Sequence, residues 1–238
     1  MNKKIFFFLF ILSVTGVFAG IIFHEKWFDY IFKPLIMISL GGMFFSETVG
    51  TSVRTKVFVG WAFLFSLLGD TFLMFTGKNQ LFFMAGLGSF LISQIGYIFL
   101  FQHSTKISGI QSWSFLKQHP LWLFLYFLYG SLIYFLLFPN LDVVLKVAVL
   151  IYMVALLGMS VMALNRKEIK PVKSFWFVFI GSLLFVISDS VIAINKFLQP
   201  VPFDGLIVMS TYMAAQFLIV KGLIFQFAKK VKSFVFRI

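Results

Sequence analysis

The 238-residue chain is 61% hydrophobic and only 12% charged, and it contains 36 phenylalanines and no cysteine. It has too few polar side chains to cover a water-soluble globule, and it is too hydrophobic to be a disordered chain. The lack of cysteine excludes disulfides, thiolate zinc sites and cysteine nucleophiles. The formal charge of +12 could indicate a protein that binds nucleic acid. The positions of the basic residues along the chain decide whether the charge reflects nucleic-acid binding or membrane topology.

Eight apolar segments are long enough to cross a membrane, because a helix needs about 20 mostly apolar residues to cross ~30 Å of hydrocarbon. In chain order they are 5–23, 30–47, 57–75, 80–101, 121–138, 142–164, 172–197 and 203–226. They lack the period-two alternation of transmembrane β-strands. The sequence therefore predicts an all-α polytopic membrane protein, with one integral membrane domain over residues 1–238.

The first segment could alternatively be a cleavable signal peptide. Lys3 and Lys4 precede the apolar stretch, and residues 17–19 (Val-Phe-Ala) resemble a cleavage site. The apolar stretch continues to Phe23, however, which makes it long enough to span. We therefore expect this segment to be retained as a helix.

The basic residues gather on one side of the predicted bundle. Fourteen of the 20 lie at the N-terminus, in alternate connections or in the C-terminal tail: Lys3, Lys4, Arg54, Lys56, Lys106, Lys117, Arg166, Lys167, Lys170, Lys173, Lys229, Lys230, Lys232 and Arg237. The connections on the other side hold only Lys26 and Lys78. The positive-inside rule then predicts that both termini are cytoplasmic, in what we expect to be a bacterial inner membrane. We expect the basic tail to attract anionic membrane lipid, and we expect no nucleic-acid partner.

Two aspartates, Asp70 and Asp189, lie inside predicted spans. An ionised aspartate at mid-membrane costs ~2.5–3.5 kcal/mol on insertion scales, so each needs a partner or a protonated form. At a rise of ~1.5 Å per residue, both lie in the outer half of the membrane. Other polar side chains at similar depths could meet them in one cavity: Lys33, Gln94, Tyr97, Lys146, Tyr152, Asn195, Lys196, Tyr212 and Gln216.

Intramembrane acids usually mark a functional site, so we expect Asp70 and Asp189 to be functional. In the structural alternative, Lys33 or Lys196 neutralises an aspartate and only holds helices together. Ser188 is a further candidate for substrate binding, although its hydroxyl could instead bond back to its own helix.

A weak internal repeat relates the two halves of the chain. "FSLLGDTFLMF" in the third span and "FVISDSVIAINKF" in the seventh each place an aspartate after an apolar run. One span later each half carries a mid-span glutamine, Gln94 or Gln216. The pattern predicts a four-plus-four duplication, and because four is even the repeats would be parallel.

Neither a metal site nor a cofactor is expected. The three histidines, His24, His103 and His119, lie in polar stretches and form no His-x-x-x-His pair. The chain also has no glycine-rich phosphate loop.

Several segments carry a resemblance to a known family. They are Lys33-Pro34 in the second span, "LLGDTFL" in the third, "GLGSFLISQIGY" in the fourth, "FVISDSVIAINKF" in the seventh and "TYMAAQFLI" in the eighth. In these segments, and in register over most of the chain, the sequence resembles the YhhN-type lysoplasmalogenases. Family members often carry histidine where Gln94 stands, which argues against a catalytic role for Gln94, although its amide can still form hydrogen bonds.

The resemblance implies a hydrolase that splits the vinyl-ether bond of lysoplasmalogens into a fatty aldehyde and a glycerophospho-headgroup. It assigns catalysis to Asp70 and Asp189. The chemistry suits them, because a vinyl ether hydrolyses by protonation of its outer alkene carbon to an oxocarbenium ion that water captures. One carboxyl group would supply the proton, and a carboxylate would stabilise the cation or activate water, as in glycosidases.

The implied partners are a lysophospholipid substrate and membrane lipid. Lys33 or Lys196 would suit the substrate phosphate as a point charge, and Tyr152 and Tyr212 would orient the ether oxygen or water. Two other functions stay open. One is a transporter or proton-coupled carrier, in which buried acids and repeats are equally typical. The other is a non-catalytic lipid-binding or scaffolding membrane protein.

Overall fold

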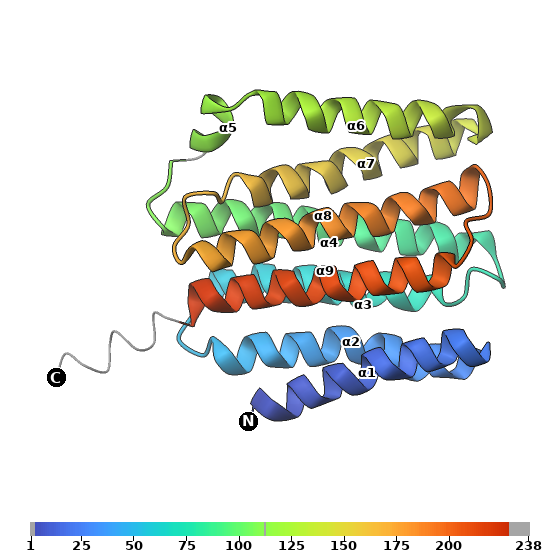
Figure 1. The fold of residues 1–238 in the computed structure, drawn as a ribbon, viewed down its shortest axis with the longest axis horizontal. Helices are drawn as coiled ribbons and strands as arrows, with labels where there is room; N and C mark the ends of the chain where they lie inside the picture. Colours follow the sequence, from blue (N-terminus) through green and yellow to red (C-terminus); the bar gives the residue numbers. More distant parts are fainter. Residues whose placement is uncertain (1–2, 112, 229–238) are drawn as a thin grey trace.

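The computed structural model describes residues 3–111 and 113–228 and consists of eight long helices that lie side by side (Figure 1). They are α1 (Lys3–Phe23), α2 (Lys26–Glu47), α3 (Val53–Leu73), α4 (Gln80–Ile107), α6 (Leu121–Leu137), α7 (Val143–Leu164), α8 (Val172–Phe197) and α9 (Asp204–Phe227). The short α5 (Ser114–Gln118) precedes α6, and the 3₁₀ turn η1 (Phe138–Asn140) follows it. All eight long helices are apolar enough to cross a membrane, so this is a multi-pass membrane protein.

These helices confirm the eight predicted spans, with differences at their ends. The largest difference is in α4, which continues to Ile107 instead of ending at residue 101. Polar side chains mark where several helices begin. Asn79 Oδ1 accepts a hydrogen bond from the Leu81 amide at 2.8 Å, and Asp142 Oδ1 accepts one from the Leu145 amide at 2.8 Å. Each satisfies an amide that the helix itself leaves unpaired.

The two ends of the bundle differ in charge. α1 begins and α9 ends at one end, which we call the basic end (Figure 1). Its connections, the helix ends beside them and the short α5 hold seven basic residues: Arg54, Lys56, Lys106, Lys117, Arg166, Lys167 and Lys170. The predicted basic tail, Lys229, Lys230, Lys232 and Arg237, lies outside the described residues. We call the other end, with the connections after α1, α3, α6 and α8, the opposite end.

The helices pack most closely where glycine removes a side chain. A Cβ atom at Gly181 of α8 would lie 2.8 Å from the carbonyl oxygen of Ala215 on α9. A Cβ atom at Gly222 of α9 would lie 2.9 Å from the carbonyl oxygen of Ser174 on α8. Small residues allow backbones to approach in this way where lipid supplies no hydrophobic driving force.

α6 lies at the edge of the bundle (Figure 1), and most of its side chains face outward. Three tyrosine hydroxyls attach it to its neighbours. Tyr126 bonds Ser160 of α7 at 2.7 Å, Tyr129 bonds Ser190 of α8 at 2.7 Å, and Tyr134 donates to a carbonyl oxygen of α7 at 3.2 Å. α6 is therefore held by these polar contacts together with apolar packing against α7, where Leu137 is buried with Leu145 and Val149.

A buried arginine ties several helices together near the basic end. Arg166, in the connection after α7, is fully buried and donates from Nε to Ser104 Oγ at 3.0 Å. Its Nη2 atom donates to Ser174 Oγ at 3.1 Å and to Gln226 Oε1 at 2.9 Å. Burial lowers the pKa of Arg166 to about 9, which leaves the guanidinium charged at neutral pH. One side chain thus bonds to α4, α8 and α9.

Candidate functional site

A cavity of about 280 Å³ lies towards the opposite end of the bundle, between α2, α3, α4, α8 and α9. We call it the polar chamber. Nine of its lining residues are polar or charged: Lys33, Asp70, Thr76, Ser188, Asp189, Asn195, Lys196, Asp204 and Tyr212. Seven of the eleven predicted site residues therefore meet here, although their positions span more than 170 residues of sequence.

Asp70 lies in the last turn of α3 and is 7% exposed. Tyr212 of α9 donates a hydrogen bond of 2.7 Å to its Oδ2 atom. The preceding residue, Gly69, keeps α3 close to α4, because a Cβ atom there would lie 2.6 Å from the ring of Phe90. The carboxylate is thus fixed between three helices.

Asp189 lies on α8, eight residues before the helix ends at Phe197, or about 12 Å along the axis at ~1.5 Å per residue. Its Oδ2 atom accepts hydrogen bonds from the Tyr152 hydroxyl at 2.6 Å and from Gln94 Nε2 at 3.3 Å. Gln94 is fully buried on α4, so its amide bonds Asp189 from inside the bundle. All hydrogen bonds that the described residues make to the two carboxyl groups fall on Oδ2, which leaves Oδ1 of each for another molecule.

A buried hydrogen-bond network links the Tyr212 hydroxyl to Gln216, Ser66 and Tyr97. Gln216, one helical turn further along α9, donates from Nε2 to the Tyr212 hydroxyl at 3.4 Å and to Ser66 Oγ at 3.1 Å. Its Oε1 atom accepts from the Tyr97 hydroxyl at 2.6 Å. Gln216 and Tyr97 do not line the chamber, and Gln216 reaches it through its hydrogen bond to Tyr212. Ser66 was not predicted, although its position four residues before Asp70 places it on the same helix face.

A second cavity, of about 70 Å³, adjoins the chamber. We call it the apolar groove. Its walls come from α3, α4, α6, α7 and α8, and are almost entirely hydrocarbon and aromatic: Leu73, Phe83, Leu87, Phe90, Tyr129, Ile133, Tyr134, Leu137, Val149, Tyr152, Met153, Leu156, Leu157, Asp189, Ser190, Ile192, Ala193 and Phe197. Asp189 lines both cavities, whereas Asp70 lines only the chamber. The two cavities therefore meet at Asp189.

Neither lysine of the chamber pairs with Asp70 or Asp189. Lys33 forms a salt bridge of 2.9 Å with Asp29, one turn earlier on α2. Lys196 places its ammonium group 5.2 Å from the centre of the Phe83 ring. The structural alternative therefore lacks a direct salt bridge to either aspartate, although Lys33 and Lys196 line the same cavity as both.

Other predicted polar residues have different surroundings from those expected. Ser188 donates to the Val208 carbonyl of α9 at 3.2 Å and so does not bond back to its own helix. Asn195 donates to Asp204 Oδ2 at 2.8 Å, which fixes the turn between α8 and α9. The expectation that Lys146 joins the cavity is wrong, because its ammonium group lies 4.1 Å from the centre of the Phe138 ring, outside both cavities.

Eight membrane-spanning helices with two carboxylates at one internal cavity define a polytopic membrane protein with an intramembrane acid pair. The model of the YhhN family matches residues 28–223. The chain therefore belongs to the YhhN family, which confirms the resemblance drawn from its motifs.

Curated proteins of known name are similar to this chain. It is 32% identical over 169 residues to the bovine (Bos taurus) "Lysoplasmalogenase TMEM86A", covering 69% of this chain and 63% of that protein. It is 31% identical over 212 residues to the Homo sapiens "Lysoplasmalogenase TMEM86B", covering 88% of this chain and 82% of that protein. The match thus spans slightly less than two thirds of the TMEM86A relative. No solved structure matches the chain.

Proposed function

We propose that this protein is a lysoplasmalogenase-like hydrolase, which splits the vinyl-ether bond of a lysophospholipid into a fatty aldehyde and a glycerophospho-headgroup. The observation that carries the proposal is the pair of carboxylates, Asp70 and Asp189, at a polar chamber that continues into an apolar groove. A single-chain lipid has a matching division into a polar head and an apolar chain. The names of the curated relatives support the same reaction.

The two aspartates would divide the acid and base work. A protonated carboxyl group gives its proton to the outer alkene carbon, and the alkene electrons form the new C–H bond. The ether oxygen then shares its electrons with the remaining carbon as an oxocarbenium ion. The second aspartate, as a carboxylate, takes a proton from the attacking water. The resulting hemiacetal releases aldehyde as its glycerol oxygen regains a proton, so one water is consumed overall.

The surrounding side chains have supporting roles in this proposal. Tyr152 and Tyr212 hold Oδ2 of each aspartate, so that Oδ1 can reach substrate. Lys33 and Lys196 would bind the substrate phosphate at the chamber wall. Ser188 and Asn195 shape the same wall. Gln94 would hold Asp189, while Tyr97 and Gln216 position Tyr212.

The proposed location is a bacterial inner membrane with both termini in the cytoplasm. The supporting observation is the excess of basic residues at the end where α1 begins and α9 ends. This orientation places the polar chamber in the outer half of the membrane, within reach of lipid headgroups on that side.

Aldehyde release from a lysoplasmalogen by the purified, detergent-solubilised protein tests the function. We expect Asp70→Asn and Asp189→Asn each to lower turnover by about 10²-fold or more, because each removes an acid–base group. Glu168→Gln is the matched control, since this exposed carboxylate lies in a connection at the basic end. Undiminished turnover in either aspartate variant contradicts the two-aspartate mechanism. If folded, monodisperse wild-type protein releases no aldehyde, the hydrolase proposal fails and gradient-driven lipid flux becomes the next assay.

A further inference from the structure

The two cavities that meet at Asp189 differ sharply in chemistry. The chamber carries two lysines, three aspartates and a tyrosine, whereas the groove is walled by Leu, Ile, Val, Met and aromatic side chains. An alkyl chain gains hydrophobic stabilisation in the groove, and a charged headgroup would lose its hydration there. The wall chemistry therefore permits only one orientation of a single-chain phospholipid.

We propose that the alkenyl chain of the substrate lies in the apolar groove and its glycerophospho-head in the polar chamber, which makes Asp189 the general acid and Asp70 the carboxylate that receives the proton of water. The inference rests on the proposed hydrolase function. In a vinyl ether, the alkene carbon that takes the proton is on the chain side, and the carbon that water attacks is bonded to the head-side oxygen. Asp189 faces both cavities and Asp70 only the chamber, which matches this order.

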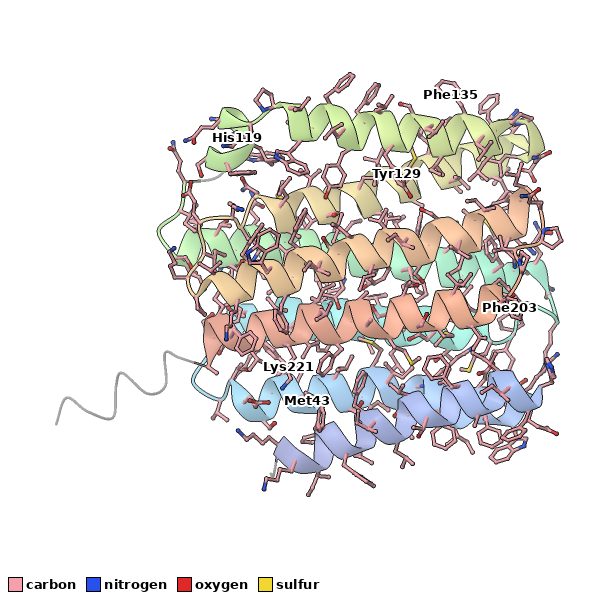
Figure 2. All side chains as sticks on the ribbon, in the orientation of Figure 1. Met43, His119, Tyr129, Phe135, Phe203 and Lys221 are labelled. Carbon is pink, nitrogen blue, oxygen red and sulfur yellow. The ribbon has the colours of Figure 1, made fainter. Side chains whose placement is uncertain are left out.

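The rest of the chain would leave the groove between α6 and α8. The groove of about 70 Å³ is smaller than a long alkyl chain, so only the carbons nearest the ether fit within it. Figure 2 shows Tyr129 directed from α6 towards the neighbouring helices, while Phe135 points away from them. The hydrogen bond from Tyr129 to Ser190 lies at the exposed rim of the groove. Because the apolar packing of α6 is against α7, and Tyr129 bonds α8 at an exposed position, the seam between α6 and α8 is where an alkyl chain can pass into lipid.

Asp189 transfers its proton to the chain-side carbon and becomes a carboxylate, and the positive charge moves to the head-side carbon and ether oxygen. Water adds to that carbon and gives a proton to Asp70. When the hemiacetal collapses, Asp70 gives its proton to the departing glycerol oxygen and the hemiacetal hydroxyl gives its proton to Asp189, which restores both groups for the next cycle. No redox partner is needed.

Protection of a thiol from labelling tests the position of the lipid's alkyl chain without requiring turnover. The protein lacks cysteine, so Ala193→Cys places one thiol in the groove, and Ile187→Cys places one on the lipid-facing side of the same helix. We expect 1-O-hexadecyl-glycerophosphoethanolamine, a saturated ether that cannot be cleaved this way, to slow maleimide labelling of Ala193→Cys. At ligand tenfold above its Kd the slowing should be about tenfold.

The controls separate the chain from the headgroup. Labelling of Ile187→Cys should stay unchanged, and glycerophosphoethanolamine without a chain should protect neither thiol. Leu157→Cys supplies a second groove position if Ala193→Cys does not fold. Equal protection by the chainless compound, or no protection by the ether at the groove position tested, overturns the chain placement. Protection in a protein that releases no aldehyde leaves this placement standing and rejects only the proposed hydrolysis.

Azide rescue tests the assignment of the two aspartates. Azide is a nucleophile that needs no general base, so it can capture the oxocarbenium ion in Asp70→Ala and form an α-azido ether that water later converts to aldehyde. At neutral pH azide is present almost entirely as the anion, so it supplies little acid to replace Asp189. We therefore expect azide to raise the turnover of Asp70→Ala and to leave Asp189→Ala inactive. Rescue of Asp189→Ala alone, or of neither variant, overturns the assignment.

Discussion

Asp70 and Asp189 each accept a hydrogen bond from a tyrosine on another helix. Tyr212 of α9 donates to Asp70 of α3, and Tyr152 of α7 donates to Asp189 of α8. Gln216 donates to the Tyr212 hydroxyl and accepts from Tyr97, but it does not bond Asp70. Gln94, beside Tyr152, donates directly to Asp189. The two carboxylates thus have similar partners but different surroundings, which suits groups with different tasks.

Removing one tyrosine hydroxyl should weaken catalysis without disturbing the fold. A hydrogen bond to a charged group contributes about 1.5–3 kcal/mol, so Tyr212→Phe and Tyr152→Phe should each lower kcat by roughly 10- to 100-fold. Tyr30→Phe, at an exposed ring that stacks on Phe75 away from both cavities, should leave kcat unchanged. Steady-state aldehyde release and the thermal unfolding midpoint measure the two effects. Full activity in both cavity variants would show that these hydroxyls do not serve the aspartates.

At the scale of the helices, the sequence alone could not predict which helices contact one another or which side chains face the cavities. The eight spans follow from apolar length alone, and the depth of Asp70 and Asp189 follows from counting residues. Side-chain direction does not follow, and this is why Lys146 was expected in a cavity that it does not line. The apolar groove was not predicted at all, because Leu and Phe on a lipid-facing wall look identical in sequence to Leu and Phe around a cavity.

The internal repeat stays a prediction. Asp70 of the first half is bonded by Tyr212 of the second half, and Asp189 of the second half is bonded by Gln94 of the first. Each half therefore completes the surroundings of the other's aspartate. This crossing explains why neither half of the sequence, taken alone, defines the site.

The contact between α8 and α9 sets the distance between residues on opposite walls of the chamber. We expect Gly181→Val to lower stability by about 1–3 kcal/mol, because its Cβ atom would meet the Ala215 carbonyl and overpack a closely packed interface. Gly88→Val makes the same chemical change in α4, where a Cβ atom meets nothing within 4 Å. Comparing the unfolding midpoints of the two variants separates packing from helix propensity. Equal midpoints would show that the α8–α9 glycine contact is not needed.

At the scale of the whole molecule, charge and cavity lie towards opposite ends. Basic residues gather in the connections where α1 begins and α9 ends, while the chamber lies towards the other end. The positive-inside rule then predicts which face of the membrane the chamber serves.

Single cysteines in the cysteine-free chain can test this orientation. Lys78 lies in the exposed connection after α3, and Lys170 in the exposed connection after α7. With a membrane-impermeant maleimide on intact spheroplasts, Lys78→Cys should be labelled at once and Lys170→Cys only after permeabilisation. The reverse pattern would place the chamber on the cytoplasmic side.

The junction of chamber and groove also bears on how the reaction ends. In the proposed reaction, cleavage at Asp189 would cut the lipid where one cavity meets the other, and would leave the aldehyde in the groove and the glycerophospho-fragment in the chamber. The aldehyde can diffuse sideways into the bilayer between α6 and α8, while the water-soluble glycerophospho-fragment escapes through the chamber. Neither product has to pass the other. Inhibition by accumulated product should then come from the soluble fragment, which competes for the chamber, and much less from the aldehyde, which the bilayer dilutes.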